Sequence, residues 1–498
     1  MLVKQGDLGE GQDGVQAQRA EEPDSPRSQS PHSSEEASVI DVERRAGRKV
    51  ESVKNRQAEE QLEAVSARTI RAGDVRARWA WTEPTVWTER MLMALEEGVK
   101  GGQWYSVMDK VYTQANLRAA FTRVKANHGA VGVDHQTIEA FERDLTRNLE
   151  KLGDELREGS YRPRAVRRHW IPKPGAPQEQ RPLGIPTVRD RVAQAALYHV
   201  IAPIYERDFA AHSYGFRPQR GSKEALRRTA QLLQTGYTYV VDADLKSYFD
   251  TIPQERLLAQ VRTKISDGKV LALLVAFLTQ GVMEGGAHWT PEAGTPQGGV
   301  LSPLLANLYL DPLDHAMAQA GYEMVRYADD FVILCRSEEE AQRALAQVRQ
   351  WTAQAGLKLH EDKTRLVNAQ QTGGFDFLGY HFERGSRWPR KKSARKLKDT
   401  IRTKTKRTNG HSLHAIILDV NRTVRGWFEY FKHSHKTTFP SLDSWVRMRL
   451  RSILRKRKGQ KGRGRGADHQ RWPNAFFQAH GLYSMTAAHA LLRQSSCR

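Results

Sequence analysis

The stretch Tyr327-Ala-Asp-Asp330 places two adjacent carboxylates between two largely apolar runs, 322–327 and 331–335. Two runs of this kind, separated by a short polar turn, predict a β-hairpin with the acids at its tip. Adjacent carboxylates repel each other and need cations nearby, so this tip is a candidate site for a divalent metal. A solvated acidic turn is the simpler alternative, and the rest of the chain bears on that choice.

A second group of acids follows the apolar run from Tyr237 to Val241, which predicts a short buried strand. Alternation along a strand puts Asp242 and Asp244 on one face. Enzymes that use two metal ions draw carboxylates from separate parts of the chain onto one surface. The two acidic groups are therefore candidates for a shared site, with Asp242 and Asp250 as secondary metal ligands.

The net positive charge of the chain comes entirely from its last fifth. The formal net charge is +21, and residues 391–498 hold 26 Lys and Arg against 5 Asp and Glu. The other 390 residues carry 52 basic and 52 acidic groups, so they contribute nothing to the excess. A one-sided basic segment is typical of a protein that binds a polyanion. No apolar stretch is long enough to span a bilayer, so nucleic acid is favoured over a membrane.

Cysteine usage and the first residues of the chain indicate a reducing compartment. There are two cysteines, Cys335 and Cys497, which excludes a disulfide framework and a Cys-rich zinc module. Residues 1–5 lack the apolar core of a signal peptide. We therefore expect a cytoplasmic protein.

Composition divides the chain into three parts. Residues 1–75 are polar and rich in Ser and Pro, which predicts disorder. Residues 85–385 have a mixed α and β pattern, with helices predicted over 188–205 and 338–355. Residues 391–498 are basic and mostly of helical pattern.

Several longer strings, together with the acidic groups, resemble blocks of bacterial group II intron reverse transcriptases. The strings are Ile171-Pro-Lys-Pro174, Arg181-Pro-Leu-Gly-Ile-Pro186, Ser213-Tyr-Gly-Phe-Arg-Pro218, Thr295-Pro-Gln-Gly-Gly-Val-Leu-Ser-Pro-Leu-Leu-Ala-Asn307, Gly356-Leu-Lys-Leu-His-Glu-Asp-Lys-Thr364 and Asn421-Arg-Thr-Val-Arg-Gly-Trp-Phe-Glu-Tyr-Phe-Lys432. The last of these resembles the maturase motif of the same family. The paired-cysteine His-Asn-His endonuclease that many of these proteins carry has no counterpart in this sequence.

The resemblance implies roles for particular residues. Asp244, Asp329 and Asp330 match the catalytic carboxylates that bind two Mg²⁺ ions. Phe249 matches the aromatic residue that selects deoxynucleotides, although Tyr248 and Phe249 can also be read as ordinary core residues. The positions that match nucleotide-binding residues are Lys173, Arg181, Phe249, Gln297 and Lys363, with Lys363 a candidate general acid for the pyrophosphate leaving group.

RNA contacts are expected from cations of the basic C-terminal part. The candidates are Arg422, Arg425, Lys432, Arg447, Arg451, Arg455 and Lys456. Arg217 and Arg220 are further candidates for contacts to template or primer phosphates.

The resemblance predicts an α+β fold in the shape of a right hand: fingers and palm around an antiparallel palm sheet, then a helical thumb or maturase domain. It implies an RNA-directed DNA polymerase with RNA template, DNA primer, deoxynucleotides, target DNA and group II intron RNA as partners. Two alternatives remain open at this point. One is a reverse transcriptase domesticated for defence or repair, without an intron, and the other is an RNA-binding maturase with little polymerase activity.

Overall fold

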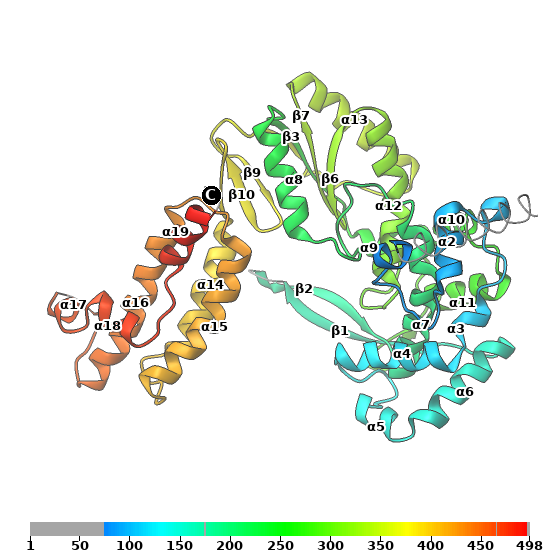
Figure 1. Ribbon diagram of the computed structural model, residues 1–498, viewed down its shortest axis with the longest axis horizontal. Helices are drawn as coiled ribbons and strands as arrows, with labels where there is room; N and C mark the ends of the chain where they lie inside the picture. The colour runs from blue at the N-terminus through cyan, green and yellow to red at the C-terminus, as the bar shows by residue number, and fades with distance from the viewer. Residues whose placement is uncertain (1–73, 174–175, 465, 496–498) are drawn as a thin grey trace, which may run out of the picture. The chain divides into compact units, whose positions relative to one another are not determined.

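The computed structural model describes residues 74–173, 176–464 and 466–495 (Figure 1). The N-terminal extension predicted to be disordered lies outside the described residues up to residue 73. The described part is an α+β protein in which helices surround small sheets built mainly of antiparallel pairs, and a helical segment follows them. This confirms the predicted fold class. No helix in the described ranges has the length and apolar character of a membrane span.

Helix α7 (Val188–Glu206) is the centre of the N-terminal helical part. It is buried on nearly every side, in keeping with the largely apolar character of 192–205. The Thr187 side chain caps it by accepting a hydrogen bond from the backbone N–H of Asp190. The helix predicted over 188–205 is thus confirmed. The helices around it are α2 (Glu89–Glu97), α3 (Met108–Val111), α4 (Gln114–Ala126), α5 (Ile138–Arg143), α6 (Leu145–Glu158), α10 (Gln254–Arg262) and α11 (Gly268–Leu278), with a 3-10 turn at Lys100–Gly102.

A four-stranded sheet extends from this helical part in the order β2-β1-β4-β5. Strands β1 (Val166–Lys173) and β2 (Ala176–Ile185) form a long antiparallel hairpin, which projects beyond the helices in Figure 1. The short hairpin of β4 (Val282–Glu284) and β5 (Ala287–Trp289) joins it through parallel pairing of β4 with β1. This sheet supplies one wall of the candidate site.

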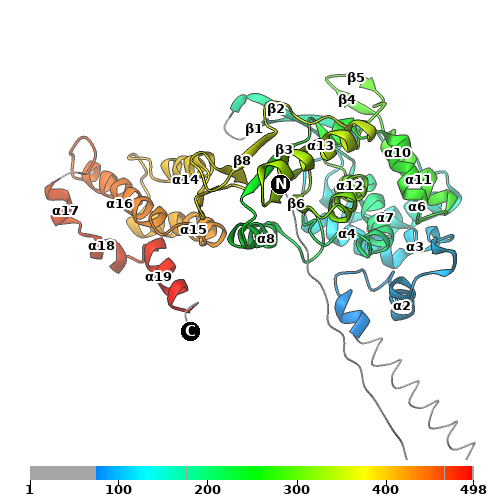
Figure 2. The same cartoon turned by 90° about the horizontal axis from the view of Figure 1, so that it is seen from above.

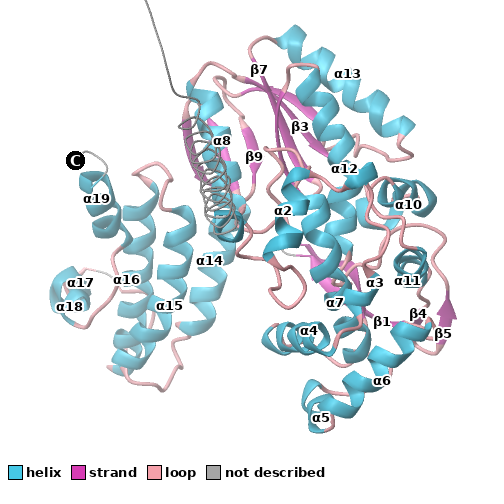
Figure 3. Cartoon of the chain, turned by 45° about the vertical axis from the view of Figure 1, so that its right-hand side comes forward, coloured by secondary structure: helices cyan, strands magenta, loops and turns pink. Residues whose placement is uncertain are grey.

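The second four-stranded sheet, β6-β7-β3-β8, is antiparallel throughout. Its strands are β3 (Tyr239–Asp244), β6 (Glu323–Tyr327), β7 (Asp330–Cys335) and β8 (Arg365–Asn368). Alternate residues of β7 are buried on opposite faces, because Phe331 and Ile333 join the core around α12 (Ser302–Gln319) and α13 (Glu338–Gln354), whereas Val332 and Leu334 join the cluster under α8 (Ser222–Gln234). Figure 3 shows the sheet between these helices. Burial on both faces holds the strand ends in fixed positions.

Two elements of this sheet region compare directly with the predictions. Helix α13 matches the predicted range of 338–355 to within one residue, and Gly356 follows it with φ +70°. Strand β3 begins two residues later than predicted and continues through Asp242 and Asp244. The strand extends that far because both acids have pairing partners on β7.

A three-stranded antiparallel sheet, β9-β10-β11, connects the palm to the helical segment that follows. Its strands are β9 (Phe375–Phe377), β10 (Tyr380–Glu383) and β11 (Ser386–Pro389). Leu378 and Gly379 form the two-residue turn between β9 and β10, with φ of +47° and +84°. Positive φ at both positions is the geometry of a tight hairpin turn, which Gly379 favours.

The C-terminal segment is helical, and its helices share a core of their own. It comprises α14 (Lys391–Lys404), α15 (Leu413–Phe431), α16 (Thr438–Arg457), α17 (Ala467–Arg471), α18 (Asn474–Ala479) and α19 (Met485–Ser495). Figure 2 shows α14, α15 and α16 side by side. The segment contacts the β9–β10 turn through Tyr430, whose hydroxyl donates to the carbonyl of Leu378 at 2.7 Å. We call this segment, 391–495, the thumb.

Candidate active site

The Tyr-Ala-Asp-Asp stretch forms the hairpin that the sequence predicts. Tyr327 and Asp330 face each other across β6 and β7, so Ala328 and Asp329 are the two turn residues. Ala328 has φ +60°, an uncommon conformation for a residue with a side chain. Gly215 packs directly against this turn, and a Cβ atom on Gly215 would lie 2.3 Å from the Ala328 nitrogen. The turn therefore needs a glycine at 215.

The three predicted catalytic carboxylates are brought together by the pairing of β3 with β7. Asp244 is the direct partner of Asp330, and Asp329 precedes Asp330 in the turn. Burial, and then the neighbouring charges of Asp242, Asp329 and Asp244, raises the pKa of Asp330 to about 7. The pKa of Asp329 is also raised, first by burial and then by Asp244. These shifts arise first from burial and then from the negative charges gathered at one edge of the sheet.

Two cations from the segment before and within β8 contact these acids. The Lys363 ammonium lies 2.5 Å from the Asp244 carboxylate, and the Arg365 guanidinium lies 3.0 Å from that of Asp242. The backbone is clamped here too, because the N–H of His360 donates to the Asp244 carbonyl at 2.8 Å. Lys363 is thus brought to the carboxylates by the segment that follows α13.

Within the described ranges, no three His, Cys, Asp or Glu side chains are arranged as a preformed metal-binding group. The donor set at the end of β3 and β7 nevertheless suits Mg²⁺, which prefers carboxylate oxygens. Burial raises the pKa values of Asp242, Asp329 and Asp330, so the ionised forms of these acids are costly without further positive charge. Divalent cations would supply that charge.

Gln297 lies in the loop before α12. The N–H of Gly184 donates to the Gln297 carbonyl at 2.6 Å, which ties this loop to the end of β2. Gly298 has φ +106°, and a Cβ there would lie 2.3 Å from the Gly184 carbonyl oxygen. The Gln297 amide donates to both carboxylate oxygens of Asp250 at 2.9 Å. Asp250 is therefore engaged with Gln297 and is not part of the group formed by Asp244, Asp329 and Asp330.

The two aromatic residues after β3 differ in their surroundings. Tyr248 is 2% exposed and donates from its hydroxyl to the Ala306 carbonyl at 2.6 Å, so it belongs to the core. Phe249 is half-buried and meets the Tyr248 ring edge to face at 5.6 Å. The Phe249 carbonyl accepts from the N–H of Thr295 at 2.7 Å, which fixes it beside the Gln297 loop. Tyr248 is thus a core residue, as the alternative interpretation of the sequence has it, whereas one face of Phe249 is partly exposed.

The predicted fingers cations lie on the long β1–β2 hairpin. Arg181 pairs with Ile171 across the two strands and is exposed. Its charge acts on Asp329, whose pKa it lowers against the larger effect of burial. Lys173 ends β1, and its side chain lies outside the part of the chain that can be described.

A cavity of about 490 Å³ opens between the sheet β2-β1-β4-β5 and the Gln297 loop. Alternate residues of one sheet face line it, among them Arg168, Trp170 and Trp289. The Arg168 guanidinium lies 5.9 Å from the ring of Trp170 and 5.6 Å from that of Trp289. Exposed indole rings with an intervening cation are suited to stacking of unpaired bases.

Comparison with known proteins identifies the family. Residues 171–382 match the family "Reverse transcriptase (RNA-dependent DNA polymerase)", and residues 394–472 match "Group II intron, maturase-specific domain". Protein YkfC of Escherichia coli is 32% identical over 347 residues, which are 62% of this chain and 86% of that protein. The chain belongs to the group II intron reverse transcriptase and maturase family.

A second relative has the intron origin in its name. The group II intron-encoded protein LtrA of Lactococcus lactis is 38% identical over 202 residues, 40% of this chain and only a third (33%) of LtrA. Among solved structures, the telomerase of Candida albicans in complex with a fragment of telomeric RNA aligns over 63% of each chain at 13% identity, with a TM-score of 0.38. That structural similarity is too low to support an argument.

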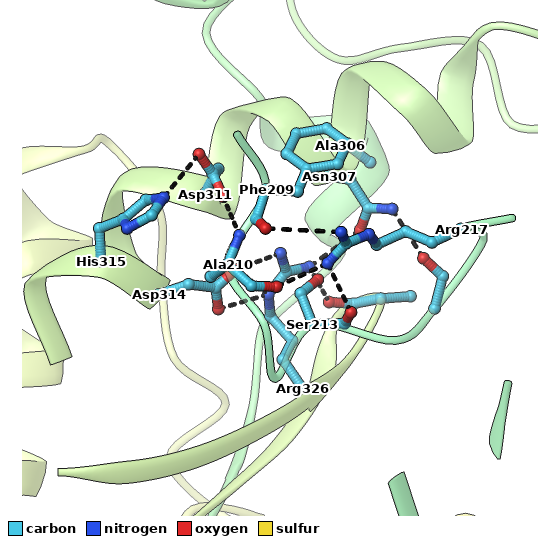
Figure 4. Close-up of polar contacts among 12 residues, drawn as sticks. Phe209, Ala210, Ser213, Arg217, Ala306, Asn307, Asp311, Asp314, His315 and Arg326 are labelled. Atoms are coloured by element: carbon cyan, nitrogen blue, oxygen red, sulfur yellow. Dashed lines mark hydrogen bonds and ion pairs between the residues drawn. The ribbon is translucent and has the colours of Figure 1, made fainter. Parts of the chain in front are cut away.

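Sequence reasoning missed a buried polar network around Arg326, which Figure 4 shows. Arg326 is 1% exposed, and its Nε donates to the two carboxylate oxygens of Asp314 at 2.8 and 3.0 Å. Its Nη1 donates to Asn307 Oδ1 at 2.9 Å and to the Ala328 carbonyl at 3.0 Å. The network thus binds the turn that carries Asp329 to α12. The available signal was a charged residue inside the apolar run before the two acids.

Arg217 belongs to the fold and not to a phosphate site. It is 6% exposed, and its Nε donates to Glu206 at 2.9 Å while its Nη1 donates to the carbonyls of Ala210 and Ser213 at 2.6 and 2.8 Å. Figure 4 shows it among these backbone oxygens. The expectation that Arg217 contacts template or primer phosphates is therefore wrong. Burial with an acid and two carbonyls leaves no donor facing solvent.

The predicted RNA-binding cations of the maturase domain fall into different environments. Arg422 and Arg425 are exposed on α15, and Lys456 is exposed on α16. Arg451 is 3% exposed and donates to the Trp472 carbonyl at 2.8 Å, so it holds the C-terminal part of the thumb together and we remove it from the RNA set. The remaining members are partly buried: Lys432 pairs with Glu429 at 3.0 Å, Arg455 pairs with Asp468 at 2.6 Å, and Arg447 lies on α16.

Proposed function

We propose that this reverse transcriptase copies RNA into DNA at the carboxylates of β3 and β7, and that its thumb binds group II intron RNA to assist splicing and mobility. The observation that carries the first half is the pairing of Asp244 with Asp330, with Asp329 in the adjoining turn. Substrates of this reaction would be a DNA primer, an RNA template and deoxynucleotides.

Asp244, Asp329 and Asp330 would hold two Mg²⁺ ions, with Asp242 nearby. When bound, the ions supply charge stabilisation at the reacting phosphate and activation of the primer hydroxyl. The chain's own contribution is to hold the carboxylates on two paired strands, so that the site is formed before substrate arrives. The clamp on the Asp244 backbone by His360 serves the same purpose.

The neighbouring side chains support binding and selection of the nucleotide and protonation of the pyrophosphate leaving group. Arg181, which already acts electrostatically on Asp329, would hold the triphosphate. Phe249, fixed beside the Gln297 loop, would exclude a ribose 2′-hydroxyl. Lys363 is proposed as the general acid for pyrophosphate, since its ammonium already lies at the Asp244 carboxylate.

The proposed binding of intron RNA is supported by the distribution of positive charge. All of the net positive charge lies in the thumb region, and Arg422 and Arg425 are exposed on the helix within the matched maturase-specific domain. A folded intron has densely packed phosphates, and a cationic protein surface stabilises such a compact form. Target DNA would be the acceptor for the copied intron.

The test of this proposal measures both halves with the full chain. Primer extension on an RNA template with Mg²⁺ should give DNA, and splicing of the cognate intron should need less Mg²⁺ when the protein is present. Reversal of charge at Arg422, Arg425 and Lys432 should reduce the splicing effect and leave extension in place. If splicing is the same with and without protein across the Mg²⁺ titration, the maturase half fails; if no DNA is made, the polymerase half fails.

A further inference from the structure

A strongly basic pocket lies at the C-terminal end of α15. It has a volume of about 550 Å³, and its walls come from β11, the segment after α15 and helix α19. Four permanent cations give it its charge, and two histidines lie beside them: Arg387, Lys432, Lys436 and Arg493, with His433 and His435. It shares no lining residue with the cavity beside Gln297, and none of Asp244, Asp329 and Asp330 lines it, so it is separate from the polymerase centre. A neighbouring cavity beside α8 shares Arg387, His433 and His435 with it.

The positive charge of this pocket is poorly compensated. None of the described residues that line it is acidic. Of its four permanent cations, Lys432 alone forms an ion pair with an acid in the described part of the chain, Glu429. Burial lowers the pKa of His433, and the charges of Arg387 and Lys432 lower it further. Like charges held together cost free energy that a bound anion would relieve.

A buried hydroxyl lies in the wall of the pocket. Ser434 is 3% exposed, and its hydroxyl makes no hydrogen bond of good geometry within the described ranges, although it interacts with the Tyr380 hydroxyl and lowers the pKa of that group. The Tyr380 hydroxyl itself donates to the Tyr430 carbonyl at 2.6 Å, so it can only accept from Ser434. A phosphate oxygen in the pocket would be a stronger acceptor for the Ser434 hydroxyl than a phenol oxygen.

The backbone fixes the shape of the pocket. The N–H of His435 donates to the Arg387 carbonyl at 2.7 Å, and the Arg387 Nε donates to the His433 carbonyl at 2.9 Å. The N–H of Ser434 donates to the Phe431 carbonyl at 2.9 Å. These bonds tie the segment after α15 to β11, so the site is formed in the protein alone and a ligand would not have to order it.

We propose that this pocket binds a backbone phosphate of structured RNA, with Ser434 as a hydrogen-bond donor and Lys436 and Arg493 as its cations. The inference rests on the proposed binding of intron RNA by the thumb. Structured RNA is favoured over the primer–template duplex because the pocket is separate from the polymerase cavities and because 432–436 lie within the match to the maturase-specific domain.

The test compares two variants with a matched control. Ser434→Ala removes one donor, and Lys436→Gln with Arg493→Gln removes two charges. The control is Arg118→Gln with Lys151→Gln, two exposed cations on the N-terminal helices. The dissociation constant for the intron RNA is measured over a range of salt concentrations, together with thermal stability and primer extension on an unstructured template.

We expect the double variant to weaken RNA binding about tenfold and to lower the magnitude of the slope of log K against log salt by about one to two. Ser434→Ala should weaken binding by about threefold to tenfold, because it removes one hydrogen-bond donor to the phosphate. The control should match the wild type in slope. Primer extension should be unchanged in all variants.

Equal RNA affinity and slope in wild type and both variants would overturn the proposal. So would stabilisation of the wild type, but not of Ser434→Ala, by inorganic phosphate while RNA affinity stays the same, since the pocket would then take a free anion. A parallel rise in the KM for primer–template would assign the pocket to the polymerase duplex instead. Failure of the wild type to extend any primer would refute the proposed polymerase activity and leave this binding test intact.

Discussion

Replacement of Asp314 by leucine should destabilise the protein strongly, because it leaves the Arg326 guanidinium buried without its acid. Arg326 is 1% and Asp314 6% exposed, so water cannot replace the lost carboxylate. Removal of one partner from a buried ion pair costs about 3–5 kcal/mol. We therefore expect Asp314→Leu to lower the free energy of unfolding by about that amount.

The double variant Asp314→Leu/Arg326→Met separates stability from catalysis. Loss of both charges removes the unpaired ion, and such replacements are often neutral or stabilising, so most of the lost stability should return. The Ala328 carbonyl, however, still loses the donor that lies 3.0 Å away in the wild type. A hydrogen bond from a charged group contributes about 1.5–3 kcal/mol. If all of this free energy serves to position Asp329 for the reaction, the rate of primer extension falls by about tenfold to a hundredfold.

Urea unfolding gives the stability of each variant, and single-turnover primer extension gives the rate of chemistry. Glu142→Leu is the matched control, because its partner Lys125 is 53% exposed and Glu142 itself 38%. An exposed pair of this kind contributes less than about 1 kcal/mol. A double variant that is as unstable as Asp314→Leu, or one that is stable and extends primers at the wild-type rate, would refute the positioning role of Arg326.

Three further predictions concern single residues. Phe249→Ala should raise incorporation of ribonucleotides relative to deoxynucleotides in primer extension, and an unchanged ratio would make Phe249 a core residue only. Gly215→Ala should cost about 1–3 kcal/mol in urea unfolding and slow extension, because its Cβ would lie 2.3 Å from the Ala328 nitrogen; wild-type behaviour would contradict the close packing. Burial lowers the pKa of His199 from 6.5 to about 4, so the unfolded chain binds a proton that the folded chain does not, and stability should fall by about 3 kcal/mol as pH drops from about 6.5 to 4. His199→Gln should remove this part of the pH dependence, and an unchanged profile would place the cause elsewhere.

The local features of the site follow from sequence because they depend on neighbours along the chain. Two apolar runs around Ala328 and Asp329 predict the hairpin, and the alternation of β3 puts Asp242 and Asp244 on one face. The resemblance of the Gln297 loop and of the acids to group II intron enzymes supplies the rest of the assignment.

Contacts between distant parts of the chain were not predictable in the same way. The pairing of Lys363 with Asp244 depends on where the segment after α13 returns to the sheet. The spacing of apolar residues along the sequence does not predict that position. The burial of Arg217 and Arg451 was missed for a similar reason. The sequence alone does not distinguish an arginine that faces solvent from one that donates to a buried carbonyl. Three-dimensional packing decides between these roles.

The most direct test of the account is the effect of Asp329→Asn on two activities of one preparation. The amide keeps the shape of the side chain and removes the charge that would hold Mg²⁺. Extension of a DNA primer on an RNA template should be lost, while binding of the intron RNA and its splicing at low Mg²⁺ should match the wild type. Extension at the wild-type rate by Asp329→Asn would contradict the assignment of the polymerase centre to the carboxylates of β3 and β7.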